Sequence, residues 1–411
     1  MERRRVVITG IGAITPIGNN IEEMWKNVQK GICGIDEITL YDTSNQQVHL
    51  AGEVKGYDPL EYFKKKEAKK KDRFVQFGII ASREAVEDSA LDLETEDLDR
   101  CGVIMATGIG GITTIEREHS KGLEKGFDKV SPYYIPMAIA NMVAGNISIE
   151  FGFRGKSESV STACASGTNA VGDAFREIAH GYADVMIAGG AESSITPLSV
   201  GGFTSLRALS TSTDKDRASI PFDKERDGFV IAEGAGSIIL EEYEHAKARG
   251  AHIYAELAGY ATNDDANHVT APLEDGSGAA KCMKLAVKDA GIELNQIDYI
   301  NTHGTSTPLN DKGETKAVKL AFGEHAKSLC MSSTKSMTGH MLGASGAVEA
   351  IISALASKND FVPATINYKV ADEECDLDVV PNEGRNMPVN YVLSNSLGFG
   401  GHNASLIIKK Y

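Results

Sequence analysis

Several features that would place this chain in a familiar class are missing from its sequence. No apolar run reaches the roughly 18 residues that a membrane-spanning helix needs, so no membrane association is expected. Polar residues, glycines and Pro16 interrupt the apolar stretch 6–17, and no A-x-A-like site follows, so no signal peptide is predicted. The six cysteines are scattered without a C-x-x-C pair, which argues against zinc ribbons, redox motifs and disulfide scaffolds. Reduced thiols in a cytoplasmic protein are the simpler expectation.

A positive overall charge and a complete dinucleotide motif are also missing. The net charge of −15 argues against nonspecific nucleic-acid binding by the surface as a whole. Gly10 and Gly12 follow the first predicted strand, but Thr15 replaces the third glycine of G-x-G-x-x-G, so a nicotinamide site is disfavoured. Residues 64–73 reverse the sign with seven basic and two acidic side chains. From charge alone, a solvated helix face is the simpler interpretation, and a docking patch for an acidic partner is the alternative.

Short apolar runs alternate with amphipathic stretches along the whole chain, which predicts an α/β fold with both faces of the sheet covered. The predicted strands are residues 6–11, 102–106, 185–188, 237–241, 255–261, 299–302, 329–332, 391–396 and 404–409. The predicted helices are residues 21–30, 73–90, 167–180, 279–290, 313–322 and 344–356. No low-complexity linker divides the chain. We therefore expect two closely packed halves, residues 1–254 and 255–411, with a soft boundary near residues 255–261.

One cysteine and two histidines stand among small residues that would let a substrate approach closely. Cys164 lies in STACASG, His303 in NTHGTST and His340 at the end of KSMTGH. Cys164 precedes a predicted helix, whose N-terminus favours a thiolate and offers N–H groups to an oxyanion. His303 follows a predicted strand, at the sheet edge where α/β proteins place their sites. The pattern predicts a thiol nucleophile with two imidazole partners.

Other interpretations of these residues explain less of the pattern. A buried inert cysteine is the commoner fate and suits the other five cysteines, but the small-residue frame disfavours it for Cys164. A zinc site formed by Cys164, His303 and His340 lacks an evident fourth ligand. A papain-like protease would use only one of the two histidines.

Together, the segments 162–167, 303–308 and 335–340 resemble the β-ketoacyl-[acyl-carrier-protein] synthases, the condensing enzymes of type II fatty-acid synthesis. The resemblance extends from residues 6–11 to residues 395–401. Within that family the chain is most similar to the synthase II group, through the segment PFDKERDGF at 221–229 and through Ile109. It implies a thiolase-like fold with two pseudo-symmetric halves in an α-β-α-β-α arrangement, and a homodimer.

The resemblance also implies a reaction. Cys164 would take an acyl chain from a carrier-protein thioester, with the N–H groups of Cys164 and Phe399 forming an oxyanion hole. His303 and His340 would stabilise the enolate left when malonyl-carrier protein loses CO2, giving a β-ketoacyl product two carbons longer. No cofactor or metal of its own is implied, because the substrates arrive on the phosphopantetheine arm of acyl carrier protein.

Further roles are implied residue by residue. Lys335 would lie near His340 with acidic partners, either taking part in catalysis or ordering the loop. Glu314 and Glu349 match the acidic partners of this lysine, and Asp311 is a further supporting residue around the site. The substrate-contacting set is Thr270, Thr305, Thr307, Ile109, Phe203 and Phe229, with Ile109 gating the acyl pocket across the dimer and Phe399 gating access to Cys164. Lys65, Lys69 and Arg207 match docking positions, which favours docking of an acidic carrier protein over the solvated-face interpretation.

Three rival functions remain open at this stage. A ketosynthase of a polyketide or specialised lipid pathway would have the same residues and another substrate. A degradative thiolase would need a second cysteine near the first, and a silent chain-length partner would lack Cys164. Two departures from the family pattern stand near the predicted gate, Leu397 where Phe is frequent and His402 where Thr is frequent.

Overall fold

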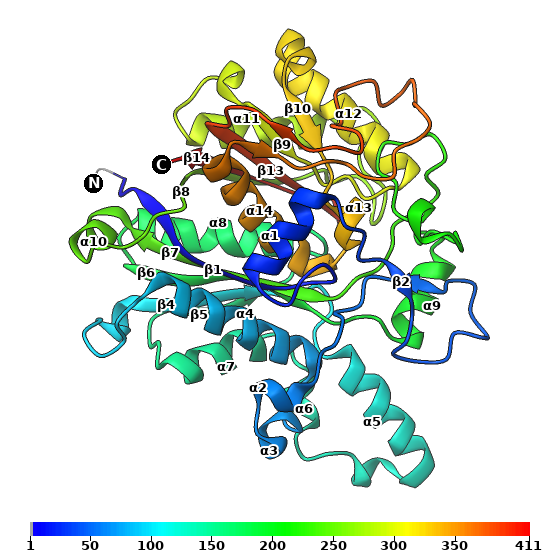
Figure 1. Cartoon of the computed structure of the whole chain (residues 1–411). Coiled ribbons are helices and arrows are strands. Elements are labelled where there is room, and N and C mark those ends of the chain that lie inside the picture. Colours follow the sequence, from blue (N-terminus) through cyan, green and yellow to red (C-terminus); the bar gives the residue numbers. More distant parts are fainter. Residues whose placement is uncertain (1–2) are drawn as a thin grey trace.

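The computed structural model describes residues 3–411, so the first two residues of the predicted N-terminal half lie outside it. A ten-stranded mixed sheet runs through the described chain (Figure 1). In sheet order its strands are β10 (Cys330–Ser332), β9 (Tyr299–Asn301), β13 (Tyr391–Gly398), β14 (His402–Lys410), β8 (Ala255–Asp264), β1 (Val6–Ile14), β7 (Gly234–Glu242), β6 (Val185–Glu192), β4 (Cys101–Ala106) and β5 (Ser157–Val160).

The strand order reads the same outward from its centre in both directions. The central pair is β1 and β8, which join antiparallel through residues 6–8 and 255–257. From β1 outward, β7 and β6 are antiparallel neighbours, and β4 and β5 follow in parallel. From β8 outward, β14 and β13 are antiparallel neighbours, and β9 and β10 follow in parallel. Each half of the sheet therefore repeats one topology.

Helices form three layers around the two halves of the sheet, as Figure 1 shows. The inner layer is α8 (Ser166–Ala179) with α14 (Ser345–Asn359), and α4 (Arg73–Ser89) with α7 (Met142–Phe151) covers the outer face of the first half. The outer face of the second half carries α11 (Ser277–Asp289) and α12 (Pro308–Phe322). The order of layers is α-β-α-β-α.

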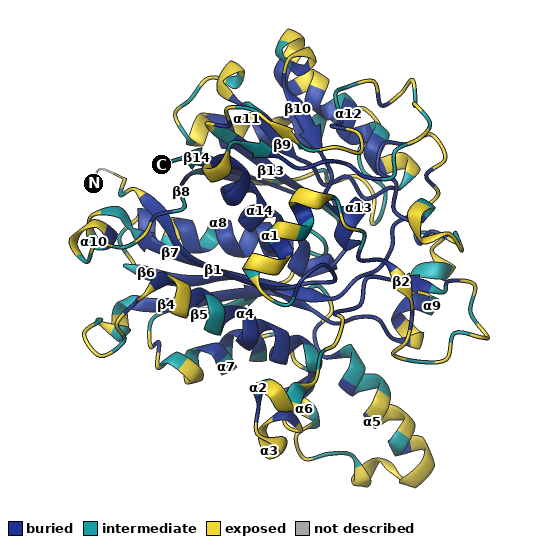
Figure 2. Ribbon diagram, viewed as in Figure 1, coloured by how far each residue is buried: buried dark blue, intermediate teal, exposed yellow. Residues whose placement is uncertain are grey.

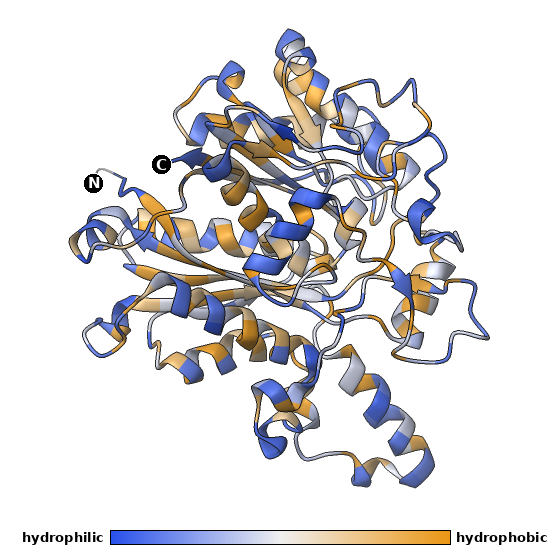
Figure 3. Ribbon diagram, in the orientation of Figure 1, coloured by the Kyte–Doolittle hydropathy of each residue, from blue (hydrophilic) through white to orange (hydrophobic). Residues whose placement is uncertain are grey.

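The inner helices are buried because their sequences are small and apolar. Every residue of α14 from Ser345 to Ser357 is buried, and Figures 2 and 3 show this helix between the two halves of the ten-stranded sheet. The starts of α8 and α14 approach so closely that a Cβ on Gly346 would lie 2.1 Å from the Thr168 hydroxyl oxygen. This approach matters for function, because Cys164 directly precedes one of these helices.

The remaining elements lie mainly in the loops around this core. They are α1 (Ile21–Lys30), α2 (Pro59–Tyr62), α3 (Lys65–Ala68), α5 (Ile112–Lys125), α6 (Tyr134–Ala138), α9 (Pro197–Ser205), α10 (Tyr243–Ala248), α13 (Lys335–Thr338), β2 (Asp36–Glu37), β3 (Leu50–Ala51), β11 (Phe361–Val362) and β12 (Arg385–Asn386). Among the described residues, no helix combines the length and the apolar character that crossing a membrane requires.

Most predicted elements are present with shifted ends. The largest shift is in α12, which begins five residues before the predicted start at 313 because Pro308 occupies its first turn. The helices α5 and α7 were not predicted.

Candidate active site

Cys164, His303 and His340 meet at one cavity of about 370 Å³. They come from the turn before α8, the loop after β9 and the loop after α13. Of the other predicted site residues, the cavity is also lined by Phe203, Arg207, Phe229, Thr270, Thr305, Thr307 and Phe399. The three segments that sequence alone could not connect are therefore brought together by the fold.

Cys164 sits on a tight turn whose backbone places its sulfur next to two N–H groups. The preceding residue, Ala163, has a φ of 50°, and α8 begins two residues after the cysteine. The N–H groups of Phe399 and Cys164 lower the pKa of the thiol, as does the Lys335 charge. Burial outweighs them and raises the pKa of Cys164 to about 12. The backbone N–H groups at the turn thus favour the thiolate, but desolvation is the larger effect on this pKa.

The two histidines face each other edge to face. Their ring centroids are 5.4 Å apart with an angle of 86° between the planes. Burial lowers the pKa of both rings well below the usual histidine value, and the Lys335 charge lowers it further. Both imidazoles are therefore neutral, as the predicted hydrogen-bonding role requires.

His340 is held at its backbone and at one ring nitrogen. Its N–H donates to the Val230 carbonyl at 2.7 Å, and its carbonyl accepts from the Ala232 N–H at 2.9 Å. Its Nδ1 lies 3.0 Å from Ser345 Oγ, at the start of α14, and its Nε2 has no hydrogen-bond partner within residues 3–411. When the Ser345 hydroxyl donates to Nδ1, the proton of the neutral ring is on Nε2. Ser345 was missed in the sequence, where nothing distinguishes it from other serines.

Glu314 fixes the loop that carries His303. Its two carboxylate oxygens accept from the N–H groups of His303 and Gly304, each at 2.8 Å, and Asn395 Nδ2 donates to the same group at 2.8 Å. The sequence predicted Glu314 as a partner of Lys335. The structure shows no ion pair between them, and Lys335 pairs with Glu349 instead.

Lys335 begins α13 and is buried in an ion pair with Glu349 of α14. Burial raises the pKa of Glu349 to about 7, and the neighbouring ammonium opposes that rise. The Lys335 charge also acts on Cys164, His303 and His340, whose pKa values it lowers. Its charge therefore acts on all three residues, although Lys335 itself does not line the cavity.

Asp311 joins two loops beneath the cavity. It accepts from the Phe222 N–H at 2.8 Å and from the Ser306 N–H at 3.2 Å, and it lies 3.6 Å from the Arg226 guanidinium. Phe222 and Arg226 belong to the segment 221–229 that sets the chain close to the synthase II group. Asp311 thus links the loop that carries Phe222 to the loop that carries Ser306.

The predicted substrate-contacting residues divide into two groups. Thr305 and Thr307 lie with their hydroxyl oxygens 3.0 Å apart at the cavity, and Phe203 and Phe229 form an edge-to-face pair at 5.3 Å. Ile109 does not line the cavity and is 38% exposed. Apolar side chains that were not predicted, Leu206, Pro272 and Leu309, also line it.

The loop that carries Phe399 approaches the nucleophile through glycine. A Cβ on Gly398 would lie 2.6 Å from the Thr162 carbonyl and 3.4 Å from the Cys164 nitrogen, so a side chain there would displace the turn. Gly400 has a φ of 92°, and its N–H donates to the Val269 carbonyl at 2.7 Å. Leu397 lines the cavity, and His402 Nδ1 lies 3.3 Å from Asp264.

The predicted docking residues are exposed but lie in two places. Lys65 and Lys69 are on and just after α3, whereas Arg207 follows α9 and reaches the cavity. Figure 1 shows α3 and α9 in different parts of the molecule. One chain therefore does not gather the three cations into a single patch.

Comparison with known proteins defines the class to which this fold and site belong. The models for the N-terminal and C-terminal domains of β-ketoacyl synthases match residues 3–246 and 254–369. The chain belongs to the β-ketoacyl synthase family. This confirms both the resemblance found in the sequence and the predicted thiolase-like α/β fold.

Particular relatives extend over the whole chain. The 3-oxoacyl-[acyl-carrier-protein] synthase 2 of Staphylococcus aureus (strain COL) is 51% identical over 410 residues, covering 100% of this chain and 99% of the relative. The Synechocystis protein of the same name is 50% identical over 412 residues, with the same coverage.

Solved structures of ketosynthases have the same fold as this chain. A type II polyketide ketosynthase in complex with its acyl-carrier protein has a TM-score of 0.93 at 36% identity, with full coverage of both chains. A β-ketoacyl synthase from Burkholderia phymatum has a TM-score of 0.90 at 35% identity, covering 99% of this chain and 100% of the other.

Proposed function

We propose that this protein is a condensing acyltransferase of the 3-oxoacyl-[acyl-carrier-protein] synthase 2 type, which elongates fatty-acid chains by two carbons. The observation that carries the proposal is the meeting of Cys164, His303 and His340 at one cavity, in a chain 51% identical to synthases of that name. It needs no resident cofactor, because the substrates are thioesters on the phosphopantetheine arm of acyl carrier protein.

In the first half-reaction, Cys164 receives the acyl chain. Its sulfur attacks the thioester carbonyl carbon, the carbonyl oxygen becomes an oxyanion, and the carrier thiol leaves with the proton lost by Cys164. The N–H groups of Cys164 and Phe399 are placed to stabilise that oxyanion, since both already lie against the sulfur. The Lys335 charge helps to offset the burial that raises the thiol pKa.

In the second half-reaction, malonyl-carrier protein loses CO2 and its enolate carbon attacks the acyl carbonyl on Cys164. The enolate oxygen needs hydrogen-bond donors, and neutral imidazoles supply them without an added charge. For His340 the donor is Nε2–H in the tautomer in which the Ser345 hydroxyl donates to Nδ1. His303 supplies the second donor, and Cys164 is released as the new carbon–carbon bond forms.

Substrate contacts and partner docking follow from the same assignment. Thr270, Thr305 and Thr307 bind the amides of the phosphopantetheine arm, and Phe203 and Phe229 bound the apolar side of the cavity. Ile109 acts on the acyl pocket across a homodimer, which accounts for its place outside the cavity of one chain. The acidic carrier protein is attracted by Lys65, Lys69 and Arg207. The enzyme is cytoplasmic. Its chain consists of two pseudo-symmetric halves, residues 1–254 and 255–411.

Product analysis tests the reaction. The protein is mixed with dodecanoyl- and malonyl-carrier protein, and the carrier-bound products are measured by mass spectrometry. A β-keto product two carbons longer is expected, and Cys164→Ala should give neither this product nor an acylated enzyme. Failure of the wild-type protein to become acylated would overturn the assignment of the nucleophile.

A second experiment tests carrier-protein docking by reversing the charge of two lysines. The Lys65→Glu/Lys69→Glu variant should raise KM for carrier-bound substrates about threefold to tenfold, because each reversed charge weakens steering. Its KM for a small thioester should not change. An equal increase for both substrates would argue against docking at α3.

A polyketide ketosynthase is the second candidate, favoured by one observation. The structure with a TM-score of 0.93 is a type II polyketide ketosynthase. That role predicts repeated condensation, giving poly-β-keto chains on one carrier, whereas the proposed function predicts one condensation per product. A silent chain-length partner is disfavoured by Cys164.

A further inference from the structure

A lysine, a histidine and a tyrosine meet at the surface where α14 ends beside the start of β8. Lys358 is the second-last residue of α14, and His252 and Tyr254 directly precede β8. The Lys358 Nζ lies 2.6 Å from His252 Nε2 and 4.2 Å from the centroid of the Tyr254 ring. Lys358 and His252 are exposed, and none of the three lines the catalytic cavity.

The partner of Lys358 is a nitrogen base rather than a carboxylate. Lys410, by contrast, pairs at 2.6 Å with Asp360, two residues beyond Lys358. Asp88 contacts the cluster through the tyrosine: it accepts from Tyr254 Oη and from the Ile11 N–H, each at 2.9 Å. Its charge raises the pKa of Lys358, but among the described residues no ion pair joins the two.

A lysine and a histidine at this distance share one proton between two nitrogens. An ammonium has no lone pair, so His252 Nε2 is a neutral acceptor while Lys358 is charged. Partial burial lowers the pKa of the Lys358 ammonium, against a smaller opposing influence of Asp88. The amine is thus closer to its nucleophilic form than a lysine held by a carboxylate, and a neutral imidazole is in contact to take its proton. Burial and the Lys358 charge lower the pKa of His252, which keeps that imidazole neutral before the reaction.

We propose that Lys358 is a site of covalent acylation by small acyl thioesters, with His252 accepting the amine proton. His252 Nε2 first takes one proton from the Lys358 ammonium, and the freed Nζ lone pair attacks the thioester carbonyl carbon. The C–S bond then breaks and the leaving thiolate takes the second Nζ proton, so the products are an amide, a free thiol and a protonated His252. The class of acyl donor rests on the proposed function, which places the enzyme among acyl thioesters.

The test uses the full-length Cys164→Ala protein, so that no acyl group can reach lysine through the nucleophile. The protein is incubated with S-acetyl-N-acetylcysteamine, and acetylation is followed by peptide mass spectrometry at Lys358 and at Lys410 in the same sample. Lys358 is expected to react about tenfold faster or more, a modest effect for a contacting general base. Equal or slower reaction at Lys358 would overturn the proposal.

A second variant separates proton acceptance from simple exposure. His252→Gln keeps a hydrogen-bond acceptor beside Nζ but removes the base, so the Lys358 rate should fall to that of Lys410 while the Lys410 rate is unchanged. An unchanged Lys358 rate would exclude His252 from the reaction. Because this background lacks Cys164, a failed acylation leaves the proposed condensation untouched, and a failed condensation leaves this site untouched.

Discussion

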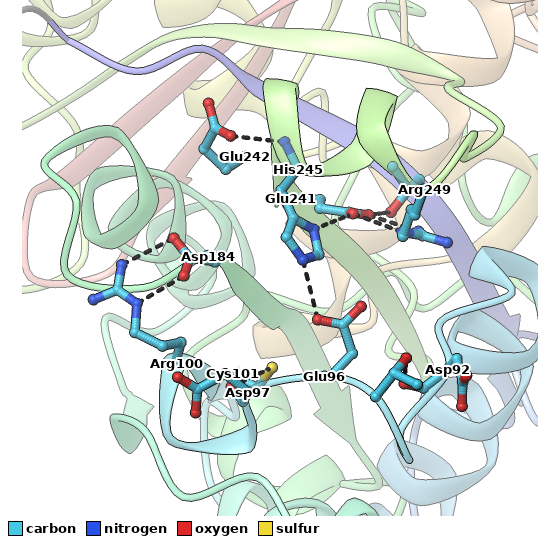
Figure 4. Close-up of polar contacts among 12 residues, drawn as sticks. Asp92, Glu96, Asp97, Arg100, Cys101, Asp184, Glu241, Glu242, His245 and Arg249 are labelled. Atoms are coloured by element: carbon cyan, nitrogen blue, oxygen red, sulfur yellow. Dashed lines mark hydrogen bonds and ion pairs between the residues drawn. The ribbon is translucent and has the colours of Figure 1, made fainter.

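Two regions of the structure place histidines beside charges of opposite sign: an ammonium at the cavity and carboxylates at α10. At the cavity, His303 and His340 are buried beside the Lys335 ammonium, and the pKa of each ring is far below its usual value. On α10, His245 contacts two carboxylates: Nδ1 lies 2.6 Å from Glu241 and Nε2 lies 3.1 Å from Glu96 (Figure 4). The pKa of His245 is raised, because these partners outweigh its desolvation.

The difference teaches that two carboxylate partners can outweigh desolvation at His245, whereas at the cavity burial and the Lys335 charge act in the same direction. Glu241 is itself bound by Arg249 through two contacts of 2.7 Å and by Thr9 Oγ1 at 2.8 Å, so it stays ionised. An ionised carboxylate raises the pKa of His245, whereas burial, with the Lys335 charge adding to it, keeps the cavity rings neutral. Neutral rings can serve as hydrogen-bond donors in a reaction, and a charged ring serves to join two segments of chain.

The largest expected effect separates the two regions by activity. His303→Gln or His340→Gln should lower the rate of malonyl-carrier decarboxylation about a hundredfold or more, the scale of a positioned acid–base group. His245→Gln should leave that rate within about twofold. The measurement is CO2 release under saturating substrate, with circular dichroism as the control for folding. A similar loss in all three variants would remove the distinction.

The second prediction changes the charge at the cavity. Lys335→Met removes the ammonium that lowers the pKa of both rings, so the rings should protonate at higher pH. The acid limb of decarboxylation should then move up by about one pH unit, the lower end of the effect of a neighbouring charge. Lys335→Arg keeps the charge and is the matched control. If both variants keep the wild-type acid limb, burial alone sets the pKa values.

The sequence predicted the residues of the cavity but not the contacts of His245. The frames around Cys164, His303 and His340 are local patterns of small residues, and they predicted the site, the family and the fold. The bond from Ser345 to His340 and the place of Glu314 depend on how α14 and α12 meet those loops, which no local pattern encodes. His245 and Glu96 are separated by 149 positions, so their contact could not be predicted. The position of Ile109 outside the cavity of one chain likewise depends on tertiary packing, so it could not be predicted from a local pattern.

The third prediction concerns stability and its dependence on pH. Since the folded-state pKa of His245 is raised, its contribution is fully present below the pKa of the unfolded chain, near 6.5, and is lost as pH rises through the folded-state value. His245→Gln should therefore lower the free energy of unfolding by about 1.5–3 kcal/mol at pH 6 and by less at pH 9. Urea unfolding at both pH values measures this.

The control for that experiment is His180→Gln, at an exposed histidine that follows α8. It should change the free energy of unfolding little, and equally at both pH values. If the cost of His245→Gln were the same at pH 6 and pH 9, the ring would be neutral in the folded protein, and the contrast with the cavity would fail.

The smallest expected effect comes from removing one of the two carboxylates that face His245. Glu96→Gln keeps an acceptor near Nε2 but removes a charge, so it should cost about 1 kcal/mol or less at pH 6. The pKa of His245, followed by NMR of the ring protons, should fall below the wild-type value while staying above that of an unpaired histidine, because Glu241 remains in contact. An unchanged pKa would mean that Glu241 alone holds the proton and that Glu96 only fixes the segment before β4. In either case the cavity rings should not respond, since their charge state depends on Lys335 and burial, and a change in their titration would show that the two regions are coupled.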